Sequence, residues 1–287
     1  STRCSGTGVP AERDPLLLGV DLGAGSLKAT LITPDGTPAG DGSHPVPTHQ
    51  PAPGWSEQDP ADWWTALCAA VRAALAAAGP GAAGRVVGLA LSAGAHTQVL
   101  EDEAGRVIRR AILWNDQRSG AETRELRERA DARILEIGAN RANPTWTLPQ
   151  MLWLRRREPE NFARVRRMYL AKDWLRAQLT GTWETDTIDA LGALMVDAAT
   201  ARWSEELCGM IGWPMASLPP IVAPTAVVGR VGEAAAAATG LAAGTPVVCG
   251  SSDTAVETFG AGMVTGGLGV VKLATAATVS VLSPHAR

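Results

Sequence analysis

The stretch "GVDLGAGSLKATL", residues 19–31, decides the fold, because an apolar run ends in Asp21 and a glycine-rich loop follows it directly. After the loop, apolar residues alternate with polar ones, which is the period of a strand and not that of a helix. The pattern therefore predicts a hairpin with a strand over Leu16–Asp21, a tight loop over Gly23–Ser26 and a second strand over Leu27–Thr33.

The loop lacks the features that define two other phosphate-binding loops. A dinucleotide-binding fingerprint needs a third glycine and a following helix, and a P-loop needs Gly-Lys-Ser or Gly-Lys-Thr before a helix. What remains is a hairpin whose backbone N–H groups can face an anion without a helix behind them. We expect Asp21 to hold Mg²⁺ through water, since magnesium takes few protein carboxylates. The candidate phosphate contacts are Gly23, Gly25, Ser26 and Lys28. The alternative is an ordinary hairpin with a solvated aspartate.

The composition excludes several classes of protein. The chain has 287 residues and a net charge of −3, from 26 basic and 29 acidic side chains, which argues against a nucleic-acid-binding surface. The cysteines are scattered, with no Cys-x-x-Cys pair, so neither a zinc site nor a disulfide framework is expected and a reduced, cytoplasmic setting fits best. No uncharged apolar stretch is long enough to span a membrane. Residues 1–14 lack the features of a signal peptide and are expected to be a disordered tail.

The rest of the chain alternates predicted strands with predicted helices, which indicates an α/β protein. A helix is expected over Pro60–Ala78, with Asp59 as its N-cap. The proline- and glycine-rich residues 40–60 are expected to be a long connection without regular structure. A strand is predicted over Val86–Leu91, and residues 267–282 form a strand–turn–strand pattern that partly repeats the opening hairpin. Further helices are predicted at residues 119–137, on either side of Pro159 and at residues 172–180.

Polar side chains follow three of the predicted strands, at the ends where open α/β sheets bind their ligands. These residues are His96, Trp114, Asp116 and Asp253. A tryptophan face can cover the C–H side of a sugar, while histidine and carboxylates bond its hydroxyls. An aspartate can also accept the hydroxyl proton during phosphoryl transfer. Each residue has a structural explanation as well. His96 and Trp114 could be core side chains, and Asp253 or Thr254 could cap the next helix.

Several stretches, in order along the chain, together resemble the FGGY family of carbohydrate kinases, and within it the xylulokinases most closely. They cover nearly the whole chain from about Leu16. Besides the opening stretch, they are "GWSEQDPADWW" (54–64), "AILWNDQR" (111–118), "LAKDWLRAQLTG" (170–181), "TDTIDALGALMVD" (185–197) and "TPVVCGSSDTAVETFGAGMV" (245–264).

The resemblance implies an actin-like ATPase fold of the ribonuclease-H-like type, with a mixed sheet and flanking helices. It also implies that ATP, with Mg²⁺, donates its γ-phosphoryl group to a sugar hydroxyl. Residues 15–264 would be the N-terminal, substrate-binding domain, and residues 265–287 the start of a truncated C-terminal nucleotide-binding domain. The expected partners are a small sugar and ATP, with no nucleic acid and no membrane, and with a homodimer left open.

Residue by residue, the resemblance implies a role for each candidate. Asp253 falls on the catalytic base, and Asp21 falls on the aspartate of the first phosphate motif. His96 falls on the sugar-contacting histidine of the xylulokinases. The other candidates are Ala95, Trp114, Asp116 and Thr254 on the sugar side and Thr275 in the second phosphate motif.

Departures from the family pattern concern both the nucleotide and the sugar. Ala24 stands where the first phosphate loop usually has threonine, and Ala274 and Ala276 replace a glycine and a serine of the second loop. Ala95 stands where a larger side chain is expected, and Thr254 where asparagine is common. The first hypothesis is ATP-dependent phosphorylation of a ketopentose hydroxyl, D-xylulose-like, by general-base catalysis. The alternatives are a sugar-binding domain without catalytic activity and a kinase of another ketose or polyol.

Overall fold

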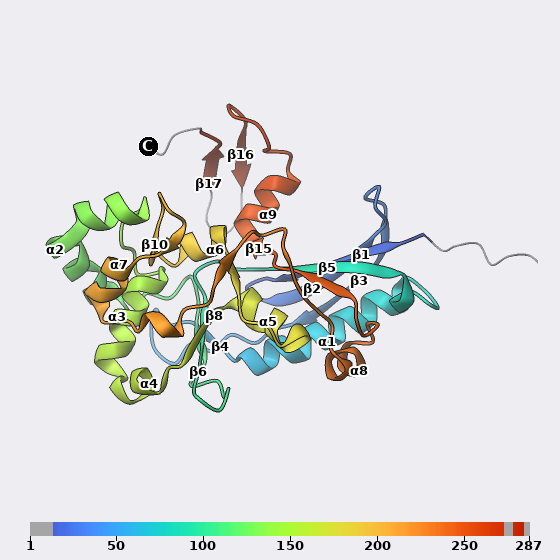
Figure 1. The fold of residues 1–287 in the computed structure, drawn as a ribbon, viewed down its shortest axis with the longest axis horizontal. Helices are drawn as coiled ribbons and strands as arrows, with labels where there is room; N and C mark the ends of the chain where they lie inside the picture. Colours follow the sequence, from blue (N-terminus) through green and yellow to red (C-terminus); the bar gives the residue numbers. More distant parts are fainter. Residues whose placement is uncertain (1–13, 273–277, 284–287) are drawn as a thin grey trace, which may run out of the picture.

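The computed structural model describes residues 14–272 and 278–283, and its largest element is a seven-stranded mixed sheet (Figure 1). The strands follow the order β13-β14-β5-β1-β2-β3, and β15 pairs with the end of β5. β5 runs parallel to β1, β14 and β15, whereas β1–β2, β2–β3 and β13–β14 are antiparallel pairs. The strands are β1 (Leu16–Leu22), β2 (Ser26–Ile32), β3 (Pro38–Pro45), β5 (Val86–Ala93), β13 (Val227–Arg230), β14 (Pro246–Val248) and β15 (Ser251–Ser252).

The opening hairpin forms as predicted. β1 and β2 pair in register from Leu17 opposite Ile32 to Leu22 opposite Leu27. Every second side chain of β1 is buried, and Asp21 points to the opposite, more open face. The strict alternation that predicted two strands therefore also decides which face carries the carboxylate.

Helix α1 (Pro60–Ala77) covers the buried face of this hairpin and begins as predicted, with the Asp59 carboxylate accepting a hydrogen bond from Ala61 N. The strand β3 lies unusually close to α1. A Cβ atom at Gly42 would lie 2.2 Å from the carbonyl oxygen of Ala70 on the helix, and Gly40 is equally restricted. Only glycine lets the strand and the helix approach this closely.

The prediction that residues 40–60 form a connection without regular structure was wrong in part. This segment contains most of β3 and the short β4 (Glu57–Gln58). Its glycines allow close packing rather than mark a loop, and prolines stand at the two ends of β3, the outermost strand of the sheet. Edge positions tolerate proline because no neighbouring strand needs its N–H.

A second sheet lies between the main hydrophobic core and a second core, contributes side chains to both, and is covered by helices that form the other end of the molecule (Figure 1). Its order is β4-β7-β6-β8, with β6 (Gln98–Glu101), β7 (Ala111–Ile112) and β8 (Arg167–Leu170). The helices packed here are α2 (Gly120–Gly138), α3 (Thr147–Arg157), α4 (Pro159–Arg164) and α7 (Glu205–Ile211). The predicted break at Pro159 is thus confirmed, and the predicted helix 119–137 is present but kinked at Ala130, which has non-helical φ −150°.

Short elements connect the two ends. Helices α5 (Ala171–Thr180) and α8 (Glu233–Thr239) pack on α1, and α5 ends at Gly181 as predicted. The remaining elements are β9 (Thr185–Asp186), α6 (Thr187–Gly192), β10 (Val196–Asp197), β11 (Arg202–Trp203) and β12 (Ile221–Val222), with 3₁₀ turns at Ala83–Arg85 and Met215–Ser217. None of the helices in the described part of the chain combines the length and apolarity needed to cross a membrane.

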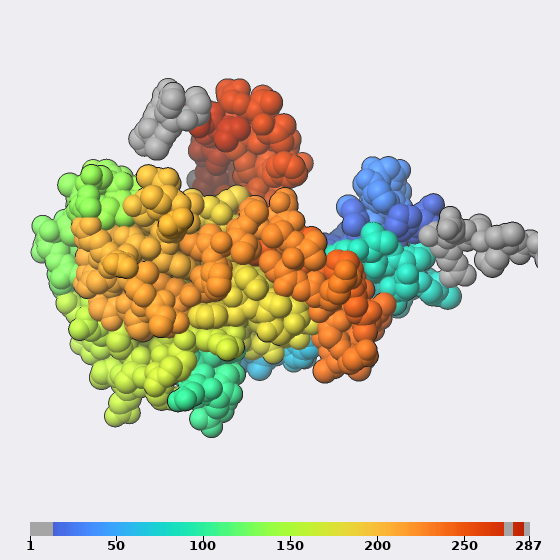
Figure 2. Space-filling model, in the orientation of Figure 1, coloured from blue at the N-terminus to red at the C-terminus, as the bar shows by residue number. Residues whose placement is uncertain are grey.

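The last elements project from the body of the molecule (Figure 2). They are α9 (Asp253–Gly260) and the antiparallel pair β16 (Gly269–Lys272) and β17 (Thr278–Val281), so both strands of the second predicted hairpin are present. The predicted turn, with Thr275 as a candidate phosphate contact, falls on residues 273–277, which lie outside the described residues. Several apolar side chains of this unit are exposed, among them Phe259 at 72% and Val279 at 75%.

Candidate functional site

Residues from four neighbouring strands form a row across the large sheet. Asp21 on β1 pairs with Lys28 on β2 and with Ser92 on β5, and Ser92 pairs in turn with Ser251 on β15. Asp253 follows Ser251 by two residues, at the start of α9. Strand pairing therefore brings the two candidate catalytic aspartates to one edge of the sheet, although 232 positions separate them along the chain.

Asp21 is half-buried at this edge, and its Oδ1 atom accepts a 2.6 Å hydrogen bond from the Ser92 hydroxyl. Burial raises the pKa of this carboxyl group, and the negative charges of Asp253 and Glu257 add to the effect, while Lys28 opposes it. Asp253 thus lies within electrostatic reach of Asp21. The site carries an excess of negative charge that a cation would relieve.

The position of Asp253 depends on a close backbone approach. Gly250 has φ +77°, and a Cβ atom there would lie 2.0 Å from the carbonyl oxygen of Leu91. Glycine therefore allows the chain to turn against β5 before α9 begins. Asp253 is the first residue of α9, the N-cap is Ser252, and the Asp253 Oδ1 atom accepts a 2.6 Å bond from Thr254 N. Neither Asp253 nor Thr254 is the N-cap.

His96 adopts the left-handed conformation, with φ +66°, three residues after the end of β5. Its Nδ1 atom lies 2.6 Å from the carbonyl oxygen of Gly192. Because a carbonyl oxygen can only accept, Nδ1 carries the hydrogen and Nε2 of the neutral ring is an acceptor. Burial lowers the pKa of His96, whereas the Gly192 bond and the negative charge of Asp253 act in the opposite direction. Trp146 stacks on the ring, with centroids 4.3 Å apart.

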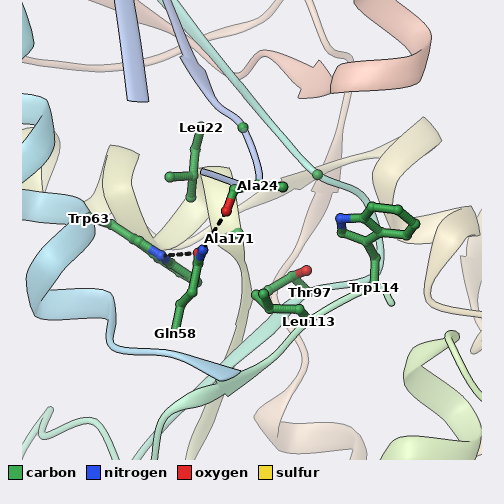
Figure 3. A pocket seen from close by; sticks show the side chains of 10 residues that line it. Leu22, Ala24, Gln58, Trp63, Thr97, Leu113, Trp114 and Ala171 are labelled. Atoms are coloured by element: carbon green, nitrogen blue, oxygen red, sulfur yellow. Dashed lines mark hydrogen bonds between the residues drawn. The ribbon is translucent and has the colours of Figure 1, made fainter. Parts of the chain in front are cut away.

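The glycine loop is anchored by the stretch 54–64. Gln58 donates from Nε2 to the Ala24 carbonyl oxygen at 2.8 Å, and its Oε1 atom accepts from Trp63 Nε1 at 2.8 Å (Figure 3). The Gly25 carbonyl oxygen accepts from Val46 N at 3.0 Å. With two successive carbonyl groups held by the body of the protein, the loop has a defined conformation.

The loop and the sugar-side segments line one hollow. Ala24, Thr97, Trp114 and Ala171 are among its lining residues, and Figure 3 shows Trp114 opposite the Gln58 side of the pocket. Within the described part of the chain, the side chains of the two aspartates and of the histidine are not in this lining. Leu22, next to Asp21, and Thr97, next to His96, do line it, so the hollow adjoins the ends of β1 and β5.

Asp116 does not reach this hollow, and its predicted contact with the sugar is corrected here. The side chain is fully buried, and both carboxylate oxygens accept hydrogen bonds from Arg118, at 2.9 and 2.8 Å. Asp116 also accepts from Ser56 N at 2.6 Å. Arg118 in turn pairs with Glu57, which pairs with Arg109. Asp116 is therefore a structural residue that holds the loop carrying Trp114.

The other candidates lie as follows. Ala95 is half-buried beside the histidine, and Thr254 is exposed on the first turn of α9.

Lys272 on β16 forms an ion pair with Glu257, which lies one turn after the candidate base. The hydrogen bond to Glu257 raises the pKa of Lys272, and the charges of Asp253 and Asp21 contribute. Sequence reasoning missed this lysine, because nothing in a strand pattern signals an ion pair to another element.

Other contributors were missed for the same reason. Ser92 orients Asp21, Gln58 anchors the loop, and Trp146 and Gly192 hold the histidine ring. Gly192 lies inside the stretch 185–197, which the family resemblance includes without a role.

Comparison with known proteins identifies the family. Residues 16–260 match the N-terminal domain of the FGGY family of carbohydrate kinases. The xylulose kinase of Bacillus subtilis (strain 168) is 33% identical over 263 residues, which cover 92% of this chain and 52% of that protein. The xylulose kinase of Escherichia coli (strain K12) is 32% identical over 261 residues, covering 91% and 53%. The crystal structure of xylulose kinase from Rhodospirillum rubrum is similar with a TM-score of 0.91 at 29% identity, covering 95% and 57%.

The chain spans about half the length of the curated relatives it matches. The fold is the actin-like ATPase fold expected from the resemblance, with a mixed sheet and flanking helices. From the extent of the family match, the identity to its members and this fold, the chain belongs to the FGGY family of carbohydrate kinases.

Proposed function

We propose that the protein phosphorylates a ketopentose hydroxyl, D-xylulose-like, with ATP as the phosphoryl donor. The observation that carries this proposal is that Asp253, beside the row of paired strand ends, lies within electrostatic reach of both Asp21 and His96. The similarity to xylulose kinases supports the choice of sugar. Residues 265–287 would begin the nucleotide-binding domain, and the exposed apolar side chains of this unit support that assignment.

In the proposed reaction, the Asp253 carboxylate accepts the hydroxyl proton as that oxygen attacks the γ-phosphorus of ATP. The new O–P bond forms while the bond from the γ-phosphorus to the β–γ bridging oxygen breaks, and ADP leaves. General-base assistance of this kind contributes about 10²–10⁴-fold to the rate. The neutral His96 ring accepts a hydrogen bond from another hydroxyl through Nε2 and thereby orients the sugar.

The glycine loop and Asp21 would address the triphosphate and Mg²⁺. Asp21 fits a divalent cation bound through water, because its carboxyl group is half-buried among negative neighbours. Gly25 and Ser26 would place backbone N–H groups toward the phosphates, and Lys28 is opposite Asp21 on the neighbouring strand. The Gly23 N–H, also expected to face a phosphate, instead donates to the Ser26 carbonyl oxygen at 3.0 Å and closes the loop. When bound, Mg²⁺ would neutralise part of the charge on the transferred phosphoryl group.

The test is calorimetric titration of the 287-residue chain with D-xylulose, with other ketoses and polyols, and with ATP–Mg²⁺. Sugar-dependent ADP formation is then measured on the longest form of the protein that contains these residues. Binding and turnover of D-xylulose in preference to the other sugars supports the proposal. Absence of sugar binding contradicts it, and turnover of a different polyol corrects the substrate.

One observation favours a second function, a sugar-binding domain without kinase activity. Ala24 supplies no hydroxyl at the loop position where the family usually has threonine, and its carbonyl group is bound to Gln58. Titration separates the two functions directly. Binding of D-xylulose with no binding of ATP–Mg²⁺ and no ADP formation by the longest form would establish the second function.

A further inference from the structure

A fully buried lysine lies beneath the candidate site, in the stretch 170–181. The Lys172 ammonium group lies 2.7 Å from Asp173 Oδ1, 2.8 Å from Asp186 Oδ2 and 3.3 Å from Asp189 Oδ2. All four side chains are buried. Taking so many charges out of water is costly, and it is tolerated only when the charges are paired. A merely stabilising role is therefore a weak explanation for this cluster.

Asp186 links the lysine to two separate elements. Its Oδ1 atom accepts a 2.9 Å hydrogen bond from the Ser251 hydroxyl. The same oxygen caps α6 by accepting from Ile188 N at 2.9 Å and Asp189 N at 3.2 Å. One carboxylate, held by Lys172, thus fixes both the strand β15 and the beginning of the helix α6.

The first link leads to the candidate base. Ser251 on β15 pairs with Ser92 on β5, and Asp253 follows it by two residues. Arg176, also buried and paired with Asp173, adds a second contact to this segment, because its Nη1 atom donates to the Cys249 carbonyl oxygen at 3.2 Å. The segment that precedes the base is therefore held at two points by the cluster.

The second link leads to the candidate sugar-binding histidine. Helix α6 has only six residues and ends at Gly192, whose carbonyl oxygen accepts from His96 Nδ1. Six helical residues span about 9 Å, so a displacement at the Asp186 end reaches the carbonyl group at the other end. The cluster therefore holds both the segment that precedes Asp253 and the helix whose last residue contacts His96.

We infer that Lys172 is a positioning residue, which through Asp186 sets the relative placement of Asp253 on one side of the sugar site and of His96 on the other. This inference rests on the proposed function. It adds a role for a buried side chain that touches neither the sugar nor the nucleotide.

Three variants test the inference. Lys172→Met removes the charge and keeps a side chain of similar length. Ser251→Ala removes only the hydrogen bond to Asp186 that leads to the candidate base. Ser217→Ala is the matched control, since Ser217 is equally buried and donates to the Pro214 carbonyl oxygen at 2.8 Å in the other half of the molecule. Thermal unfolding establishes which variants are folded before any comparison is made.

Two NMR measurements on the unliganded chain test the two links, one for the histidine and one for the segment that carries the candidate base. The ring-nitrogen signals of His96 report the Nδ1–H tautomer, which we expect Lys172→Met to lose and Ser251→Ala to keep. Amide exchange at Thr254, whose N–H donates to Asp253, should accelerate in both variants. We expect Ser217→Ala to match the wild type in both readouts.

With sugar present, we expect Lys172→Met to weaken D-xylulose binding about tenfold, because a misplaced contact loses much of its effect. Ser251→Ala should lower kcat about 10–100-fold with little change in KM, as expected for a shifted base. A folded Lys172→Met with unchanged His96 signals and unchanged sugar affinity would overturn the inference. If Lys172→Met does not fold, an unchanged kcat and unchanged Thr254 exchange in Ser251→Ala overturns it.

The two proposals fail in distinguishable ways. If the wild-type chain binds no D-xylulose, the proposed function is wrong, while the signals of the unliganded chain still show whether Lys172 positions the two groups. If the wild type binds D-xylulose but both variants match the control in every readout, the proposed function stands and the inference is wrong.

Discussion

The His96 ring donates its Nδ1 hydrogen to the carbonyl oxygen of Gly192 at 2.6 Å, across 96 positions of the sequence. This bond leaves Nε2 as an acceptor, and Trp146 stacks on the same ring. The histidine is therefore held in one orientation and one tautomer before any sugar binds. Such preorganisation lowers the cost of ordering the site on binding.

Gly192→Ala should weaken sugar binding. A Cβ atom at this position would lie 3.0 Å from His96 Nδ1, which is tight enough to displace the ring. We expect the dissociation constant for D-xylulose to rise about tenfold, the cost of one misplaced hydrogen bond. Titration calorimetry measures this change, and Gly209→Ala on α7, where nothing lies within 4 Å of the added Cβ, is the control. Equal affinity in the two variants would count against the role of His96.

Protonation of His96 should weaken sugar binding only below the pH at which an exposed histidine titrates. Burial lowers the pKa of His96 from its usual 6.5, so the ring loses its acceptor Nε2 at a lower pH than a free imidazole would. Affinity should fall only at lower pH, as the ring becomes protonated. Titration calorimetry at a series of pH values checks this. In the His96→Gln variant, the loss of sugar affinity at low pH should be absent. A loss of affinity centred at or above pH 6.5 is the contrary result.

Asp189 should make the protein more stable at pH 5 than at pH 8. Burial, together with the charges of Asp173 and Asp186, raises its pKa to about 7 despite the attraction of Lys172. Because the folded state holds a proton that the unfolded state releases above about pH 4, this contribution is lost as pH rises toward 7. The slope is at most about 1.4 kcal/mol per pH unit.

Urea unfolding at several pH values isolates this effect by comparing the wild type with Asp189→Asn. The difference in the free energy of unfolding between them should change between pH 5 and 7 and level off above pH 7. A constant difference across that range would show that Asp189 titrates normally.

Asp116→Ala should cost stability rather than sugar contacts. Removing a buried carboxylate leaves Arg118 without its main partner, which typically costs about 3–5 kcal/mol. Exposed pairs contribute far less, about 0–1 kcal/mol, so Glu206→Ala, which breaks the exposed pair with Arg133, is the control. Chemical denaturation measures both. A loss near that of the control would show that the buried pair is dispensable.

Local patterns predicted the parts of the fold that depend on neighbours in the sequence. Strict alternation located the opening hairpin, and Asp59 with the proline after it located α1. The strand β3 was missed because its glycines, which usually mark loops, here serve a contact with α1 that only the tertiary structure reveals.

The same distinction explains the candidate site. His96 and Asp253 follow strands, so the rule that ligands bind at strand ends selected them as candidates, whereas Asp21 lies near the end of β1 and was selected because a glycine-rich loop follows it. Asp116 also follows a strand, but Arg118 turns its carboxylate inward, and a sequence pattern does not show which way a side chain turns. The partners of His96 and Asp186 are distant in sequence, and no spacing rule connects them.

The most direct test of the account is the rate of D-xylulose-dependent ADP formation by the longest form of the protein, compared between the wild type and Asp253→Asn. If Asp253 accepts the hydroxyl proton, kcat falls by about 10²–10⁴-fold while D-xylulose still binds in titration. A kcat within a few-fold of the wild-type value in a folded, sugar-binding Asp253→Asn variant would contradict the assignment of this carboxylate as the base.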